Sequence, residues 1–135
     1  MEFKNVFSMN TNTLAFMGDA IYESYIRSFV ISTGEVKSEK LHKEAVKFVR
    51  ADAQANAILK MFDDLTLAEQ NLVKRARNKK ITSKPKNVDP ISYKLATAFE
   101  ALIGALYLSG ENERMEEILN KGIKIIQEEN QKGQG

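Results

Sequence analysis

One stretch decides the fold: residues 95–108 read LATAFEALIGALYL and are apolar on nearly every side of a helix. A helix with this pattern is usually buried on nearly all sides. Asp89 offers an N-cap before it, and Pro90 takes the first helical position, where a missing N–H does no harm. Ser109-Gly110 is a stop signal. We therefore predict a core helix from Ile91 to Leu108.

Outside this stretch, apolar residues again recur at helical spacing, and alternation of β-branched residues is almost absent. Thr66 and Glu69 form a capping box that starts a helix leading into a basic segment. The other predicted helices run from Thr13 to Ile31, from Ser38 as N-cap to Phe62 with room for a bend, and from Glu113 to Gln127; Lys80 to Val88 is predicted to be a loop. The sequence thus predicts an all-α fold, a helical bundle.

The chain has 135 residues, 43% of them hydrophobic, which fits one globular domain with its own core. We predict a single domain over residues 1–135, with frayed ends at 1–10 and 128–135. The absence of cysteine excludes disulfides, thiolate metal sites and a cysteine nucleophile. Residues 1–10 lack the apolar region of a signal peptide, and no uninterrupted apolar run is long enough to span a bilayer. We therefore expect a cytoplasmic protein outside the membrane.

The net charge is only +2, but the basic residues are distributed unevenly. Seven of the 20 lysines and arginines, and no acidic residue, lie between Lys74 and Lys86. The remainder carries 13 basic and 18 acidic residues, so a mildly acidic body bears one concentrated basic segment. This distribution favours a local binding site for a polyanion.

Two carboxylates stand in unusual places. Glu100 lies in the middle of the apolar helix, where glutamate is rarely buried without a partner. Asp19 lies in an equally apolar helix after Gly18, which weakens a helix by about 1 kcal/mol relative to alanine but suits a close backbone approach. Either carboxylate can face water or pair with an arginine, as Glu23 can with Arg27. Two acidic residues on two core helices can also converge on a hard cation, and Mg²⁺ suits such a pair.

At these residues the chain resembles a known family. Residues 14–20, LAFMGDA, resemble the ribonuclease III signature, which runs leucine, glutamate, phenylalanine, leucine, glycine, aspartate. Residues 98–108, AFEALIGALYL, resemble the second acidic motif of that family, and the resemblance extends from Thr13 to Leu119. The basic residues of 74–78 and 84–87, together with Leu41-His42-Lys43, resemble the Mini-III branch, a short bacterial form that lacks a double-stranded-RNA-binding domain.

This chain departs from the larger family at two positions. Ala15 stands where the signature has glutamate, and Thr97 stands where the family has an aspartate three residues before the second glutamate. Only Asp19 and Glu100 match the four acidic residues of the family. Mini-III shares this reduction, so we expect activity to be retained. Tight binding of two metal ions is in doubt, because the number of ligands limits affinity.

The resemblance implies a magnesium-dependent endoribonuclease that hydrolyses phosphodiester bonds in double-stranded RNA and leaves 5′-phosphate and 3′-hydroxyl ends. Asp19 and Glu100 are the implied catalytic and metal-binding residues. The resemblance further implies a homodimer, with the signature helix in its interface, and a precursor of large-subunit ribosomal RNA as substrate. His42 lies nearer the apolar side of its helix, and we interpret it as a core residue or a residue that supports the site, in preference to a general base.

Two groups of basic residues are candidates for RNA binding, because A-form RNA is recognised largely by shape and phosphate contacts. The helical stripe consists of Lys40, Lys43, Lys47 and Arg50, for which a solvated helix face is the competing interpretation. The basic segment consists of Lys74, Arg75, Arg77, Asn78, Lys79, Lys80, Lys84 and Lys86.

Two other functional classes compete with the nuclease. The first is a non-catalytic relative of the same fold that binds double-stranded RNA in association with the ribosome. Retention of both Asp19 and Glu100 speaks against it. The second is a helical protein-interaction module that docks an acidic partner on the basic segment. It leaves both carboxylates unexplained.

Overall fold

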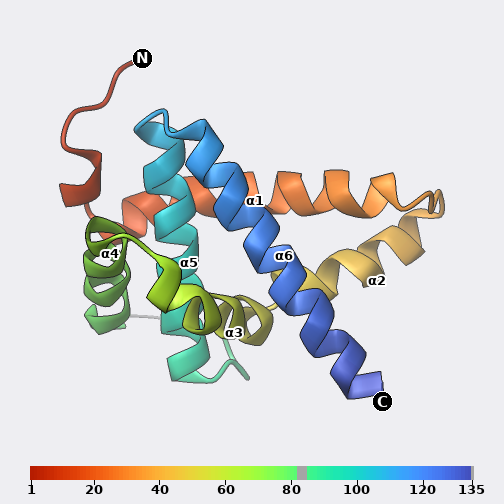
Figure 1. Cartoon of the computed structure of the whole chain (residues 1–135). Coiled ribbons are helices and arrows are strands. Elements are labelled where there is room, and N and C mark those ends of the chain that lie inside the picture. The colour runs from red at the N-terminus through yellow and green to blue at the C-terminus, as the bar shows by residue number, and fades with distance from the viewer. Residues whose placement is uncertain (82–84, 135) are drawn as a thin grey trace.

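The computed structural model describes residues 1–81 and 85–134, and every regular element in these residues is a helix. The predicted all-α fold is thereby confirmed. Figure 1 shows the arrangement of six α-helices and two short 3₁₀ segments in the described residues. Their bounds are η1 Val6–Ser8, α1 Thr11–Ser32, α2 Ser38–Val49, α3 Ala51–Met61, η2 Phe62–Asp64, α4 Leu67–Asn78, α5 Pro90–Leu108 and α6 Asn112–Gln134.

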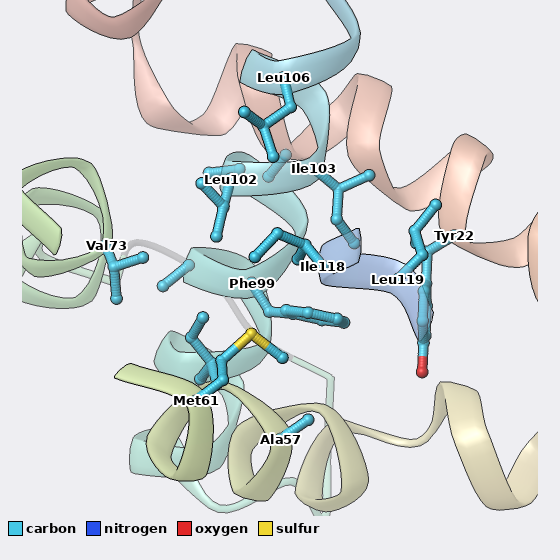
Figure 2. Close-up of a cluster of buried hydrophobic side chains, with 14 of the residues drawn as sticks. Tyr22, Ala57, Met61, Val73, Phe99, Leu102, Ile103, Leu106, Ile118 and Leu119 are labelled. Atoms are coloured by element: carbon cyan, nitrogen blue, oxygen red, sulfur yellow. The ribbon is translucent and has the colours of Figure 1, made fainter. Parts of the chain in front are cut away.

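Helix α5 is the central element, as its apolar sequence predicts. It packs against α1, α3, α4 and α6 (Figure 1). Phe99 and Leu102 are fully buried, and the ring of Phe99 meets the edge of Tyr22 from α1 at 5.2 Å between centroids (Figure 2). The helix is long and apolar enough to cross a membrane, but its apolar side chains fill the core of the domain. The predicted cap is present, since the Asp89 carboxylate accepts from the Ser92 N–H.

Two glycines allow α1 and α5 to cross in direct backbone contact. A Cβ atom on Gly18 would overlap the carbonyl oxygen of Glu100, and a Cβ atom on Gly104 would overlap the carbonyl oxygen of Leu14. Any other residue at either position would force the helices apart. The sequence-based expectation that a backbone approaches Gly18 is confirmed, and the approaching residue is Glu100 itself.

The predicted single helix from Ser38 to Phe62 is wrong: it is two helices separated at Arg50. Arg50 has φ −64° and ψ 149°, an extended conformation that ends α2 and precedes α3. The freed terminal carbonyls of α2 accept hydrogen bonds from two side chains, with Tyr22 Oη donating to Phe48 O at 2.7 Å and Gln54 Nε2 donating to Val49 O at 2.8 Å. Tertiary partners therefore stabilise a break that helical periodicity alone does not show. Ser38 is the first helical residue rather than the N-cap.

Helix α4 begins at the predicted capping box, in which Thr66 and Glu69 exchange hydrogen bonds. Glu69 is only 3% exposed and also accepts two hydrogen bonds from the Arg114 guanidinium of α6, at 2.8 and 2.9 Å. Burial alone would raise the pKa of Glu69, but the hydrogen bonds and charge of Arg114 hold it below its usual value. This carboxylate thus joins α4 to α6.

Both ends of the chain are more structured than the frayed segments we expected. At the start, Val6 is buried, and Arg75 Nη2 donates to the carbonyl oxygens of Phe7 and Met9 at 2.9 and 2.8 Å. At the other end, α6 continues to Gln134, and Lys60 of α3 pairs with Glu129. Ion pairs and backbone contacts to neighbouring helices therefore hold segments whose own sequences lack a strong apolar pattern.

Candidate active site

The crossing of α1 and α5 brings Asp19 and Glu100 together. Asp19 directly follows Gly18, and Glu100 contributes the carbonyl that touches Gly18. The two side chains lie close enough for the negative charge of Asp19 to raise the pKa of Glu100. Glu100 is partly buried, whereas Asp19 is exposed, so our expectation of two buried carboxylates is correct only in part. The pair lies at the rim of the core, where solvent and a ligand can reach it.

The surroundings of Glu100 oppose its ionisation. Burial is the largest cause, the negative charge and hydrogen bond of Asp19 add to it, and together they raise the pKa of Glu100 to about 8. The side-chain amide of Gln54 acts in the opposite direction. Two carboxyl groups in contact cannot both ionise without strong repulsion. A divalent cation between them would relieve that repulsion and favour the ionised form.

Other acidic residues contribute little to the pair. Glu23, one turn beyond Asp19, forms the predicted ion pair with Arg27 at 3.4 Å. Ala15 is buried one turn before Asp19, and the hydroxyl of Thr97 donates to Tyr93 O at 2.9 Å. Within residues 1–81 and 85–134, no group of three or more histidine, aspartate or glutamate side chains is arranged to hold a metal. The candidate site therefore has Asp19 and Glu100 as its carboxylates, with Ala15 and Thr97 as uncharged neighbours along α1 and α5.

Sequence reasoning missed two polar residues beside the pair. Tyr22 is 1% exposed, and burial, with the negative charges of Glu100 and Glu23, raises the pKa of its hydroxyl above the usual range. Gln54 is 4% exposed, and its amide acts to lower the pKa of Glu100. Nothing in the sequence singles out either residue, because Tyr22 fits an apolar helix and Gln54 lies in a stretch rich in alanine.

The basic segment is only partly a loop. Lys74, Arg75, Arg77 and Asn78 belong to α4. Arg75 holds the N-terminal segment, Lys79 Nζ donates to Asn10 Oδ1 at 3.0 Å, and Lys74 lies 5.8 Å from the centroid of the Phe62 ring. Lys84 lies outside the described residues, and Lys86 is exposed. Some of these cations therefore stabilise the fold besides being available to a ligand.

A small basic cavity of about 120 Å³ lies between the end of α4 and the first half of α5. Its lining residues are Asn12, Ala76, Lys79, Lys80, Ile81, Tyr93, Lys94 and Thr97. Tyr93, Thr97 and Glu100 follow one another at helical spacing on one face of α5, so the cavity lies about one helical turn from Glu100. Lys94 was not among the predicted binding residues. Its place next to this face could have been found from the spacing alone.

The helical stripe does not lie beside the carboxylates. Lys40, Lys43 and Lys47 line an open groove of about 790 Å³ between α2, the end of α1 and the end of α6. Lys47 pairs with Glu44 at 2.8 Å, and Arg50 pairs with Asp52 at 2.7 Å.

Another groove, of about 330 Å³, contains Glu23 and is lined on α2 by Ser38, Leu41, His42 and Ala45. His42 is exposed, so it is not a core residue. Its groove, rather than the one lined by the stripe, approaches the carboxylate pair.

The crossing of α1 and α5 and the carboxylates beside it correspond to a known class of domain. Residues 12–111 match the Ribonuclease III domain. The crystal structure of a protein from Fusobacterium nucleatum is similar to this fold, with a TM-score of 0.79, 35% sequence identity, and coverage of 90% of this chain and 98% of that one.

Individual relatives indicate one branch within this class of domain. A Mini-ribonuclease 3 from Brevibacillus brevis is 49% identical over 120 residues, covering 89% of this chain and 90% of the relative. Another from Thermoanaerobacter sp. is 42% identical over 125 residues, covering 93% of this chain and 88% of the relative. The chain therefore belongs to the ribonuclease III family, in its Mini-ribonuclease 3 branch. The resemblance inferred from residues 14–20 and 98–108 is confirmed.

Proposed function

We propose that this protein is a magnesium-dependent endoribonuclease that cuts double-stranded RNA, with Asp19 and Glu100 as its catalytic and metal-binding residues. Membership of the ribonuclease III family supports the reaction, hydrolysis of a phosphodiester bond. The single observation that carries the assignment of the site is the close crossing of α1 and α5, where the Glu100 backbone meets Gly18 and brings Glu100 near Asp19. The products carry 5′-phosphate and 3′-hydroxyl ends.

The donor set fits magnesium. Mg²⁺ is commonly bound by one or two carboxylates and keeps several of its waters. Asp19 and Glu100 supply two carboxylates at the rim of the core, and their mutual repulsion disfavours the doubly ionised pair unless a cation is present. When bound, the ion supplies an activated water and stabilises negative charge on the phosphate.

The protein's own residues contribute fixed positions and charge. The glycine contacts of α1 and α5 set the separation of the two carboxylates, because neither backbone can move closer or rotate freely. Glu100 must lose its proton to act as a ligand, so binding of a cation is coupled to release of that proton. Asp19, being exposed, is the ligand nearer to an approaching phosphate.

Contacts to RNA are proposed for the basic segment and the adjoining cavity. Lys79, Lys80 and Lys94 line the cavity near Glu100. None of the described residues that line this cavity is acidic, so the positive charge there is not neutralised. Phosphate contacts by lysine provide affinity without reading sequence. We therefore expect recognition of the shape of the duplex. The helical stripe is a secondary candidate, because it faces a different groove.

We also propose a homodimer formed through the signature helix. Phe16, in the middle of the signature, is 81% exposed, and Tyr107, which follows Gly104 by one turn, is 45% exposed. Large apolar side chains exposed together near one helix crossing favour a protein partner. The proposed cellular role, cytoplasmic maturation of a large-subunit ribosomal RNA precursor, is what the resemblance to the Mini-III branch implies.

A cleavage assay tests the proposal. The protein is incubated with long double-stranded RNA in Mg²⁺, in EDTA, and in EDTA followed by excess Mg²⁺. We expect cleavage only when free Mg²⁺ is present, and no cleavage of single-stranded RNA or of double-stranded DNA. Binding of the duplex without cleavage under all conditions would instead support the non-catalytic relative. Mapping of product ends by ligation distinguishes 5′-phosphate from 5′-hydroxyl.

A further inference from the structure

Gln54 is a buried polar residue that the proposed chemistry leaves unused. Its side chain is 4% exposed, in the first turns of α3. The amide nitrogen donates to Val49 O at 2.8 Å, but the amide oxygen is buried without a hydrogen-bond partner among the described residues. It is the one buried side-chain acceptor or donor without a partner found in residues 1–81 and 85–134. Such a group costs about 1–3 kcal/mol, so its presence calls for an explanation.

The position of Gln54 connects the helix break to the carboxylate pair. Val49 is the last residue of α2, and its carbonyl is one of the groups freed where the chain turns at Arg50. The bond to Val49 fixes the plane of the amide. The same amide lies close enough to Glu100 on α5 to lower the pKa of its carboxyl group, which means that it favours the ionised form. Gln54 therefore joins the α2–α3 junction to one of the two proposed metal ligands.

A role in capping alone does not account for this arrangement. Tyr22 already binds the neighbouring carbonyl of Phe48, and an apolar side chain at position 54 would avoid burying an unpartnered oxygen. Glu100, by contrast, has few groups that could fix its orientation. Within the described residues, the side chains that influence its pKa are Asp19, Gln54 and Glu23, and of these only Gln54 is neutral and held by a second bond, to Val49 O.

We propose that Gln54 is a positioning residue, which holds the Glu100 carboxylate in the orientation needed to bind the cation together with Asp19. This inference rests on the proposed function of the pair. One amide hydrogen is donated to Val49 O, which leaves the other for the Glu100 carboxylate, and the unpartnered amide oxygen can accept a hydrogen bond from a water at the site. Groups of this kind, which orient a ligand without touching the metal, typically contribute about 10–100-fold to metal affinity or activity.

The test uses Gln54→Met, which keeps the length and volume of the side chain but removes both hydrogen-bonding functions. The matched control is Gln70→Met. Gln70 is also part-buried, and its Nε2 donates to the carbonyl of Phe62 at 3.0 Å, at the end of another helix. It lies on α4 and makes the same kind of bond as Gln54, but it is not among the groups that influence Glu100.

Three quantities are measured for each variant: Mn²⁺ affinity by calorimetry without RNA, the Mg²⁺ concentration for half-maximal cleavage, and duplex affinity in EDTA. For Gln54→Met we expect the first two to weaken by about 10-fold or more, with duplex affinity in EDTA within a factor of about two. For Gln70→Met all three should match the wild type. If Gln54→Met is too unstable to measure, Gln54→Asn, which withdraws the amide by one carbon, should show a smaller weakening of the same two quantities.

Unchanged Mn²⁺ affinity and half-maximal Mg²⁺ in Gln54→Met would overturn the positioning role, provided that the wild type binds Mn²⁺ and cleaves RNA. An equal weakening in Gln70→Met would overturn it as well, because a general loss of stability would then explain both. A wild type that neither binds Mn²⁺ nor cleaves double-stranded RNA overturns the proposed function itself. The two failures are thus distinguishable.

Discussion

Glu69 and Glu100 show how different surroundings give two glutamate side chains different properties. Both lie against the core, yet the Arg114 guanidinium holds the pKa of Glu69 below its usual value, whereas burial and Asp19 raise that of Glu100 to about 8. A carboxylate with a cationic partner stabilises the fold. A carboxyl group pressed against another acid is poised to gain a cation or keep a proton. The distinction separates the structural acid from the proposed functional one.

Replacement of either proposed ligand should stop cleavage without unfolding the protein. Asp19→Asn and Glu100→Gln keep the side-chain shape but remove the charge that holds the cation, so we expect cleavage to fall by about 100-fold or more. Duplex binding in EDTA and circular dichroism should stay close to wild type. Glu117→Gln, on the exposed α6 side of the Arg114 pair, is the control and should cleave normally. Normal turnover by either ligand variant refutes the assignment.

The raised pKa of Glu100 also predicts how stability changes with pH. Between the ordinary glutamate value of 4.5 and about 8, the folded protein keeps a proton on Glu100 that the unfolded chain has lost. The folded state then binds more protons, so stability falls as pH rises through this window. We expect the Tm measured in EDTA to decrease from pH 5 to pH 8.5, and the decrease to be smaller in Glu100→Gln.

Magnesium provides the control for the same measurement. A bound cation favours the ionised carboxylate, so Mg²⁺ should raise the Tm of the wild type more at pH 8 than at pH 5. Glu100→Gln should show little response to Mg²⁺ at either pH. A wild-type Tm that rises between pH 5 and 8.5 by the same amount as that of Glu100→Gln contradicts the electrostatics described for the pair.

At the residue scale, the sequence identified Asp19 and Glu100 because charged residues in apolar helices are anomalous. It did not identify Gln54 or Tyr22, since the hydrogen bonds of both side chains depend on carbonyls freed by a helix break. It also overestimated the burial of Asp19, which is exposed. Helical periodicity shows which face of α1 is apolar. It does not show that α5 crosses α1 at Gly18, so that Asp19 lies at the rim of the core.

At the scale of the elements, the crossing of α1 and α5 is the feature on which the site depends. Gly18→Ala places a Cβ atom on the Glu100 carbonyl, and because that neighbour is backbone, the helices must separate. Overpacking of a core typically costs 1–3 kcal/mol, and we expect about 3 kcal/mol here. Gly133→Ala, with open space around it, is the control and should be neutral or slightly stabilising. Urea denaturation measures both, and equal stability of the two variants contradicts the close crossing.

The basic elements differ in their distance from the carboxylates, and this difference is testable. Lys80→Gln with Lys86→Gln and Lys94→Gln removes charge from the cavity and the segment beside the pair. Removal of one lysine–phosphate ion pair should flatten the dependence of log affinity on log salt by about 0.9, so the slope should fall by one to three such steps. Lys40→Gln with Lys43→Gln and Lys47→Gln, in the separate groove, should change the slope less. The reverse ranking would make the helical stripe the main RNA-binding surface.

The sequence predicted most elements because caps and apolar spacing are local. The capping box at Thr66 and the N-cap at Asp89 are both present. It failed at Arg50 and at the chain ends, where the deciding contacts come from distant residues. Arg75 illustrates this. Its charge predicted a contact to RNA, but in the structure its guanidinium donates to the carbonyl oxygens of Phe7 and Met9.

At the scale of the whole molecule, the number of active sites matters, because a duplex has two strands. A single site built on Asp19 and Glu100 can cleave only one strand at a time. The exposed Phe16 on the signature helix offers a way to bring a second pair into place. Phe16 is 81% exposed three residues before Asp19, so a symmetric contact there would set two sites at a fixed separation. A phenylalanine side chain exposed to this extent on a helix surface favours a partner that covers it.

We therefore expect the wild type to sediment as a dimer and Phe16→Glu to sediment as a monomer, because a charge in an apolar symmetric contact is repeated in both copies. The monomer should keep its helical content, bind Mn²⁺ through Asp19 and Glu100, and lose most double-strand cleavage. Leu67→Glu is the matched control, since Leu67 is 73% exposed at the start of α4, away from the signature helix, and this variant should remain a dimer with normal cleavage. Sedimentation velocity, with a nicking assay on labelled duplex, measures both properties. A wild-type monomer that cuts both strands, or a Phe16→Glu variant that remains dimeric, would place the second active site elsewhere than across this helix.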